Sequence, residues 1–175
     1  MQLTIYDAHD STFTGLNFVQ SQMWTMAIMH SSNLLMEDIY VNNTLADGKT
    51  SSNTDGADVL YSNDITMRRW TVHNGDDAIS LKGNATNVLI EDSTFYTGQG
   101  FALGSIGQYP GVFEVIENVL VRNITCVGTK YAAYLKTWYV PCKLERSLKL
   151  TLLTILQDRR RSQLPTQRRW WRVGL

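Results

Sequence analysis

Three carboxylic acids stand in two short motifs that lie close together along the chain. Asp55 belongs to "NTDGADV" (53–59), and Asp76 and Asp77 belong to "NGDDAISLKG" (74–83). Carboxylates that are held close together repel one another, which raises the pKa of at least one of them and keeps it protonated near neutral pH. A protonated acid beside an ionised one is the combination that glycoside hydrolysis requires. This chemistry depends on whether the two motifs meet in space.

Two other interpretations of these acids remain open. Aspartate and asparagine often cap turns through side-chain hydrogen bonds, and we favour this interpretation for Asp58 and Asp64. The stretch "NTDGAD" also resembles part of an EF-hand calcium loop, but the earlier ligand and the distal Glu of that loop are missing. No C-x-x-C or H-E-x-x-H pattern indicates a zinc site. We therefore expect no metal and no other cofactor.

A repeat along the chain predicts how the motifs are positioned. Five segments open with Asn or Asp, and positions +1, +3, +6 and +8 counted from that residue are mostly apolar. The opening residues are spaced 23, 31, 23 and 31 residues apart, and they are Asp10, Asn33, Asp64, Asn87 and Asn118. Alternation with a period of two indicates strands. The shift of three residues in the middle predicts a bend in each segment.

Repeats of this length with Asn at the turns predict a solenoid of parallel strands, an all-β parallel β-helix. Leucine-rich repeats have a similar period, but their Leu-rich consensus and helical return are not visible. Ordinary β-sandwich strands are the third alternative. In a β-helix, successive coils lie ~4.8 Å apart.

The stack of coils brings the two motifs together. The 31-residue spacing exceeds the 23-residue spacing by 8 residues, which the polar run "NNTLADGKTSSN" (42–53) can hold as a loop. Asp55 then lies beside Asp76 and Asp77, with Gln99 on the same face one coil further on. Strand alternation alone points Asp76 outward and Asp77 inward. Both acids can face a cleft only if the backbone bends, and Gly75 is placed to permit that bend.

The charge distribution divides the chain into two parts. Residues 1–138 hold 7 Lys+Arg against 14 Asp+Glu, whereas residues 139–175 hold 9 Lys+Arg against 2 Asp+Glu. The repeat ends at Trp138, and the following "LTLLTIL" could be a strand or a short helix. "RRWWR" has the composition of a membrane- or nucleic-acid-binding patch. A frame change or retained intron in the gene model explains a basic, patternless segment better, so we expect residues 139–175 to be such an artefact.

Other features of the sequence are less informative. No apolar run is long enough to cross a membrane, and the N-terminus lacks the pattern of a signal peptide. Cys126 and Cys142 are too few for a disulfide framework. Glycosylation sequons begin at Asn42, Asn84 and Asn123, which supports secretion weakly. We expect neither nucleic acid nor membrane as a partner.

Four motifs resemble those of glycoside hydrolase family 28, the pectin-degrading polygalacturonases and rhamnogalacturonases. They are "NTDGAD" (53–58), "NGDD" (74–77), "GQGFALGSIG" (98–107) and "YLKTW" (134–138), in the family's order and close to its spacing. The resemblance implies a right-handed parallel β-helix that hydrolyses pectin with inversion and without a metal. It also implies a secreted monomer, of which residues 1–138 are a truncated catalytic-domain fragment whose signal peptide was lost with the N-terminus.

The resemblance implies roles for four residues. Asp76 matches the general acid, and Asp55 and Asp77 match the pair that activates the water. Lys136 matches the lysine of the family's Arg-x-Lys motif, which binds a substrate carboxylate.

Two positions depart from the family's pattern. The family's Gly-His-Gly reads Gly98-Gln99-Gly100 here, and Tyr134 replaces the Arg of Arg-x-Lys. Glutamine can donate and accept hydrogen bonds but cannot titrate, and tyrosine cannot form a bidentate clamp on a carboxylate, although Tyr134 could stack on a sugar. We therefore expect Gln99 and Tyr134, together with Lys136, to bind the substrate. The run "GQGFALGSIGQYPG" resembles the fungal exo-acting branch that includes α-L-rhamnosidases, whose neutral sugar needs no Arg.

The sequence thus leaves two functional hypotheses. The first is a glycosidase of the polygalacturonase type that acts on polygalacturonan or rhamnogalacturonan, with an exo-acting enzyme or an α-L-rhamnosidase as variants. The alternative is a catalytically inactive, truncated β-helix that binds polysaccharide or has a structural role.

Overall fold

A computed structural model describes residues 1–138 in full and residues 152–155 by their backbone. Residues 139–151 and 156–175, with Cys142 and most of the predicted artefact, lie outside the described residues. Every regular element in the described part is a β-strand. The strands are β1 (Leu3–Tyr6), β2 (His9–Thr14), β3 (Asn17–Val19), β4 (Met26–Met29), β5 (Ser32–Glu37), β6 (Tyr40–Asn42), β7 (Ala57–Leu60), β8 (Ser62–Arg68), β9 (Thr71–Asn74), β10 (Asp77–Leu81), β11 (Ala85–Thr97), β12 (Gly100–Ile106), β13 (Ile116–Val127), β14 (Ala133–Thr137) and β15 (Leu152–Ile155).

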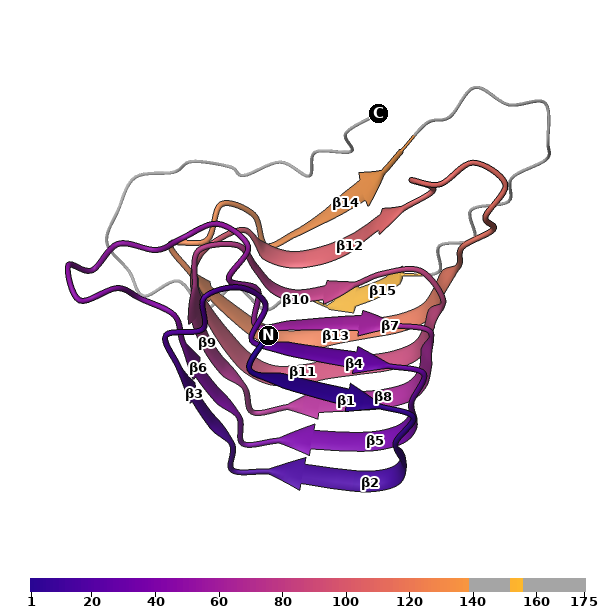
Figure 1. Cartoon of the computed structure of the whole chain (residues 1–175), viewed down its shortest axis with the longest axis horizontal. Helices are drawn as coiled ribbons and strands as arrows, with labels where there is room; N and C mark the ends of the chain where they lie inside the picture. The colour runs from indigo at the N-terminus through magenta and orange to yellow at the C-terminus, as the bar shows by residue number, and fades with distance from the viewer. Residues whose placement is uncertain (139–151, 156–175) are drawn as a thin grey trace.

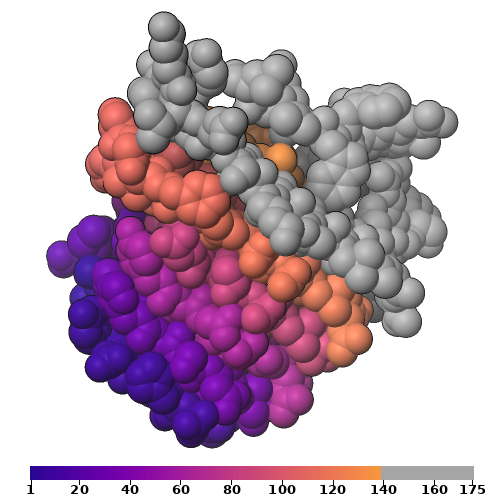
Figure 2. All heavy atoms as spheres, turned by 90° about the vertical axis from the view of Figure 1, so that its right-hand side faces the viewer, coloured from indigo at the N-terminus to yellow at the C-terminus, as the bar shows by residue number. Residues whose placement is uncertain are grey.

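The strands form two parallel sheets, which confirm the predicted parallel β-helix. Sheet A has the order β1-β4-β7-β10-β12-β14, and sheet B has the order β2-β5-β8-β11-β9-β6-β3, with β13 and β15 following β11. The chain passes from one sheet to the other in every coil, so the coils stack from indigo to orange in Figure 1. In Figure 2 they are visible as successive bands of colour on the surface.

The residues that open the repeat segments lie at sharp turns. All five have a positive φ, between 49° and 56°, and so do the residues five positions later, with φ up to 69°. Asn and Asp adopt this left-handed conformation more readily than other residues with a side chain, and glycine adopts it freely. The second set is Gly15, Asp38, Arg69, Asp92 and Asn123. The bend predicted in the middle of each segment is therefore confirmed.

The apolar positions of the repeat form the core. In the four segments that begin at Asn33, Asp64, Asn87 and Asn118, these side chains are at most 4% exposed, except the half-buried Cys126. Burying one large apolar side chain contributes about 1.5–3 kcal/mol, so the repeat accounts for much of the driving force for folding.

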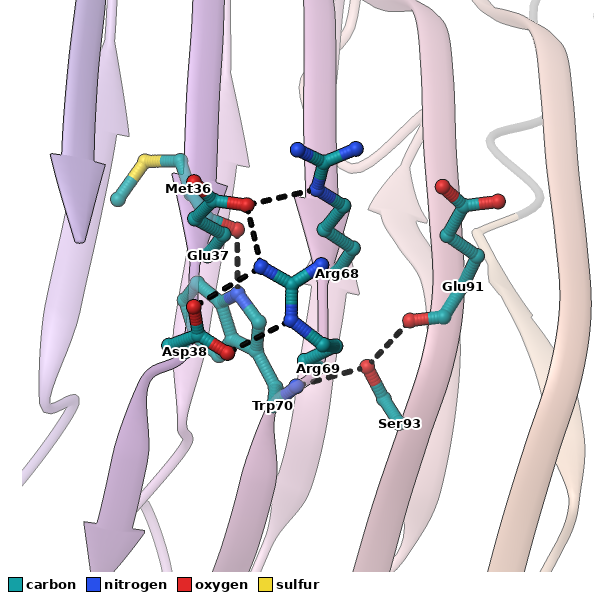
Figure 3. Close-up of polar contacts among 8 residues, drawn as sticks. All are labelled: Met36, Glu37, Asp38, Arg68, Arg69, Trp70, Glu91 and Ser93. Atoms are coloured by element: carbon teal, nitrogen blue, oxygen red, sulfur yellow. Dashed lines mark hydrogen bonds and ion pairs between the residues drawn. The ribbon is translucent and has the colours of Figure 1, made fainter. Parts of the chain in front are cut away.

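Ser93 interrupts the apolar pattern, and its hydrogen bonds explain how the core accepts it. Its hydroxyl donates to the Glu91 carbonyl over 2.8 Å and accepts the Trp70 backbone N–H over 3.0 Å. The Trp70 indole N–H donates to the Met36 carbonyl over 2.8 Å, as Figure 3 shows. Each of these buried polar groups is therefore satisfied, as burial requires.

The register of sheet B confirms the predicted spacing. Leu34 pairs with Ile65 across 31 residues, and Ile65 pairs with Val88 across 23. The additional residues of the longer coil lie in the connection between β6 and β7, as predicted. This connection leads directly to Asp55.

Charged side chains form a row on the outer face of sheet B. Glu37, Arg68, Glu91 and Arg122 are register partners on four successive strands, and we call this row the charge ladder. Arg68 binds Glu37 over 2.8 Å, and Arg122 binds Glu91. Figure 3 shows Arg69 beside the ladder, where it reaches both Glu37 and Asp38. Every acid of the ladder therefore has a guanidinium partner.

The part of sheet B beyond β13 resolves one alternative left by the sequence. Within "LTLLTIL", Leu152–Ile155 forms strand β15 and pairs in parallel with Val119–Arg122, so this stretch contains a strand.

No helix in the described ranges has the length and apolarity that a membrane crossing demands.

Candidate active site

The three acids of the two motifs meet at one end of sheet A, as predicted. Asp55 precedes β7, and Asp76 and Asp77 lie at the start of β10 on the neighbouring coil. Carboxylate oxygens of the three residues all lie within 4.8 Å of one another. We call Asp55, Asp76 and Asp77 the acid cluster.

Backbone hydrogen bonds hold the cluster across three coils. The Thr25 N–H donates to the Asp55 carbonyl over 2.7 Å, and the Gly56 N–H donates to the Asp77 carbonyl over 3.0 Å. A Cβ atom at Gly56 would lie 2.3 Å from the Ala78 carbonyl oxygen. Only glycine permits this approach, so Gly56 sets the distance between the two motifs.

Strand alternation fails at Asp77, and an irregularity in β10 is the reason. The register of β10 against β12 shifts between Asp77 and Ile79, which resets the alternation. Asp77 therefore faces the same side as Asp76 instead of the core. The backbone also bends at Gly75 and Asp76, as predicted. Gly75 is required for another reason, because a Cβ there would lie 2.1 Å from the Ser51 carbonyl oxygen.

Asp77 is fully buried and held by two residues of β14. The Tyr134 hydroxyl donates to its Oδ1, and the Lys136 ammonium binds its Oδ2. Two of the three predicted substrate-binding residues, Tyr134 and Lys136, thus contact an acid of the cluster directly. Each oxygen of the buried Asp77 carboxylate therefore has a hydrogen-bond partner, as burial of a polar group requires.

Asp76 is half-buried and is the most accessible member of the acid cluster. Its Oδ2 accepts the Asn53 backbone N–H over 2.8 Å, and its Oδ1 accepts the Asp77 N–H over 3.0 Å. The Gln99 N–H donates to the Asp76 carbonyl over 2.7 Å, which places Gln99 next to the cluster as predicted. Asp76 is therefore rigidly oriented while its carboxylate remains open to one side.

Asp55 is the acid whose protonated form is favoured. Its side chain is buried, and Oδ1 has no hydrogen-bond partner. Burial, followed by the negative charges of Asp58, Asp77 and Asp76, raises the pKa of Asp55 to about 8. The proton expected in such a cluster therefore resides on Asp55 in the free protein near neutral pH.

Asp58 is a fourth acid at the site, and the turn-capping interpretation of it is wrong. It lies within strand β7, fully buried, on the outer face of sheet A in register with Ser80. The Lys82 ammonium lies 3.0 Å from Oδ1, although neither Asp58 oxygen has a well-aligned hydrogen bond. At this distance the two charges form an ion pair. Burial raises the pKa of Asp58 to about 6.

The oxygens of the acid cluster are also close enough to one another to bind a cation. The Lys136 ammonium already compensates the charge of Asp77. The three acids thus differ in burial and in partners, and Asp55 alone has a buried oxygen without a hydrogen-bond partner, an inequality that suits acid–base chemistry.

The sequence and fold resemble known proteins. Residues 1–145 match the sequence model of a family described as Glycosyl hydrolases family 28. An α-L-rhamnosidase of Aspergillus niger is 53% identical over 137 residues, which are 78% of this chain and 32% of that protein. An exopolygalacturonase of Cochliobolus carbonum is 33% identical over 131 residues, 75% of this chain and 29% of that protein. The chain thus spans about a third of the length of the curated relatives it matches.

Two solved structures share the fold. An endo-xylogalacturonan hydrolase from Aspergillus tubingensis aligns with a TM-score of 0.71 and 21% identity, covering 87% of this chain and 39% of that one. Endopolygalacturonase I from Stereum purpureum, solved with two galacturonates, aligns with a TM-score of 0.69 and 21% identity, covering 83% and 42%.

Proposed function

The chain belongs to glycosyl hydrolase family 28, and we propose that it carries the catalytic centre of a glycosidase that hydrolyses pectin with inversion. The observation that supports acid–base hydrolysis most is the acid cluster, in which three carboxylates from two coils meet within 4.8 Å. Inversion is proposed from the family resemblance and not from this spacing, since inverting sites usually hold the two carboxyl groups ~6.5–9.5 Å apart. Acid–base hydrolysis of a glycoside needs one carboxyl group that donates a proton and another that activates water.

We assign the catalytic roles from the resemblance and from the surroundings of each acid. Asp76, the most accessible, delivers the proton to the glycosidic oxygen as the bond to the anomeric carbon breaks. Asp55 and Asp77 orient the water that attacks the opposite face of that carbon and accept its proton. Oxygens within 4.8 Å of each other can share one water, since two hydrogen bonds of ~2.8 Å span up to ~5.6 Å.

The proton on Asp55 in the free protein is compatible with these roles. The three acids interact strongly, so protonation belongs to the cluster as a whole. We propose that the shared proton moves to Asp76 when a substrate oxygen lies beside it, which leaves Asp55 free to act as the base.

We propose that the sugar at the cleavage subsite is neutral, with rhamnose the first candidate. Lys136 and Lys82 each bind a buried aspartate, and Tyr134 occupies the position at which the family has Arg. A sugar carboxylate would therefore lack a free bidentate partner here. The α-L-rhamnosidase relative, 53% identical, supports this assignment, and a galacturonate at this subsite is the second candidate. Because pectin lies outside the fungal cell, we also propose that the protein is secreted.

An assay of the 175-residue chain on three substrates tests the proposal. An aryl α-L-rhamnoside, rhamnogalacturonan and polygalacturonan are compared, and proton NMR records the anomer that forms first. We expect hydrolysis of the rhamnoside with inversion, and we expect Asp76→Asn to lower kcat/KM by about 10²–10⁴, the contribution of a general acid.

Two results would contradict the proposal. A folded chain, verified by circular dichroism and cooperative unfolding, that hydrolyses none of the substrates supports the non-catalytic β-helix instead. If a folded Asp76→Asn variant still hydrolyses the substrate at the original rate, Asp76 is not the general acid.

A further inference from the structure

Asp58, Lys82 and Trp24 form a second polar group beside the acid cluster. The Lys82 ammonium contacts Asp58 at 3.0 Å and lies 4.8 Å from the centre of the Trp24 ring. Its side chain is 15% exposed, and that of Asp58 is fully buried. A cation over an aromatic face is attracted to it, and more strongly when water is excluded. The ammonium is therefore held between two partners.

The fold places this group against the catalytic acids. Asp58 follows Asp55 by three residues and faces the same outer side of sheet A. Thr25, the residue after Trp24, donates its N–H to the Asp55 carbonyl over 2.7 Å. Lys82 follows β10, whose first residue is Asp77, and donates its own N–H to the Val59 carbonyl over 2.9 Å. The three side chains thus come from three successive coils, each fixed by backbone hydrogen bonds.

We propose that Asp58, Lys82 and Trp24 are positioning residues, in which the Lys82 ammonium stabilises a buried carboxylate next to Asp55 and thereby determines which acid of the cluster holds the proton. This inference rests on the proposed function. It assigns the three residues no contact with the substrate.

The charges around Asp55 support the inference. Asp58 raises the pKa of Asp55 more than any other charged group does, ahead of Asp77 and Asp76, while Lys82 lowers it. Lys82 also lowers the pKa of Asp58, against the effect of burial. Among the described residues, Lys136 is another cation that lowers the pKa of Asp58, and its ammonium binds Asp77. The Asp58–Lys82 pair therefore acts on Asp55 with two opposing charges that can be removed separately.

Opposite substitutions in the pair make the test specific. In Asp58→Asn the negative neighbour of Asp55 is lost, so the alkaline limb of the kcat/KM profile should move to lower pH by about one unit. In Lys82→Gln the positive neighbour is lost, so the same limb should move to higher pH over the range in which Asp58 stays ionised, because loss of Lys82 also raises the pKa of Asp58. Lys82→Arg keeps the charge and should restore the original limb. Asp64→Asn, on the far sheet and at a turn that suits Asn, is the matched control and should change nothing.

A pair with a purely structural role would behave differently. Both charge-removing variants would lose stability, and neither would move the limb, which would overturn the inference. If Asp58→Asn does not fold, Lys82→Gln and Lys82→Arg still decide: a limb that is unchanged in Lys82→Gln, while an NMR titration shows that Asp58 is ionised, contradicts the proposal.

A carboxyl-carbon NMR titration of Asp55 separates this inference from the proposed function. It needs no substrate and compares the full-length chain with the same variants. Shifts of the Asp55 titration in opposite directions support the positioning role even in a chain without hydrolytic activity. An Asp55 titration that is unchanged in the variants overturns the positioning role even in an active enzyme.

Discussion

Carboxylates gather in two regions of this β-helix, and their surroundings give them opposite properties. In the charge ladder, hydrogen bonds from Arg68 and Arg69 hold the pKa of Glu37 below its ordinary value. In the acid cluster, burial raises the pKa of Asp55 to about 8. Both regions arise from stacking, which places equivalent residues of successive coils side by side. A row with alternating signs is stabilising, whereas a buried row with excess negative charge is poised for proton transfer.

The largest effect on stability is expected from removing the cation of the acid cluster. Lys136→Met leaves Asp77, which is fully buried, without its ammonium partner. Breaking a buried ion pair by removing one member typically costs about 3–5 kcal/mol. Urea unfolding near neutral pH measures this loss. A variant as stable as the original chain would show that Asp77 is not held as a buried anion.

The Tyr134 hydroxyl, which donates to Asp77, should contribute less to stability than the Lys136 ammonium does. Tyr134→Phe removes one hydrogen bond to the Asp77 carboxylate, and hydrogen bonds to charged groups contribute about 1.5–3 kcal/mol. We expect the free energy of unfolding to fall by this amount and kcat/KM to fall as well, because Asp77 is then less firmly oriented; urea unfolding and the rhamnoside assay measure the two losses. Tyr131→Phe is the control, because it keeps the ring that packs 4.9 Å from Tyr134. Equal activity of the two variants would contradict this role of Tyr134.

The free energy of unfolding should fall as the pH rises. Carboxylates that are paired with cations produce the opposite trend. The pKa of Asp55 is about 8 in the folded protein, against an ordinary 3.8, so the folded state binds the proton more tightly between these values. The free energy of unfolding then decreases by up to ~1.4 kcal/mol per pH unit over that window. The raised pKa of Asp58, about 6, adds to this loss of stability in the lower part of the same pH window.

Asp55→Asn should remove most of this pH dependence. The variant is expected to be more stable than the original chain at pH 7.5 and similar to it at pH 4.5, as measured by urea unfolding. If stability depends on pH in the same way in both proteins, Asp55 does not hold the proton.

The smallest effect is expected in the charge ladder. Arg122→Gln removes a guanidinium that is 53% exposed, and exposed ion pairs contribute about 0–1 kcal/mol. Thermal unfolding at low and high salt measures the difference, which should shrink as salt screens the charges. A loss as large as that in Lys136→Met would show that the two regions do not differ as we infer.

Much of the fold could be predicted because the repeat is local. Asn33 and Asp38 adopt turn conformations that few other residues tolerate, and Met36 and Val41 alternate toward the core. These properties depend on residue type and spacing, so they can be read along the chain. The 23- and 31-residue spacings also predicted the register, and with it the meeting of Asp55 with Asp76 and Asp77.

The partners of the acids could not be predicted in this way. Lys136 was expected to bind a substrate carboxylate, and in the structure its ammonium binds Asp77. Lys82 and Trp24 were not identified, because a single Lys or Trp has no spacing signal. Asp58 looked like a turn residue because it stands near Gly56 and Asn53.

Residue types and periodicity alone determined the stacked coils, the turns and the convergence of three acids, since each follows from backbone preferences repeated along the chain. Only the tertiary structure decided which way Asp77 points, which acid holds the proton and which lysine compensates which carboxylate. The physical reason is that side-chain direction and pKa depend on neighbours contributed by other coils. One shift in the register of β10 was enough to turn a residue expected in the core toward the site.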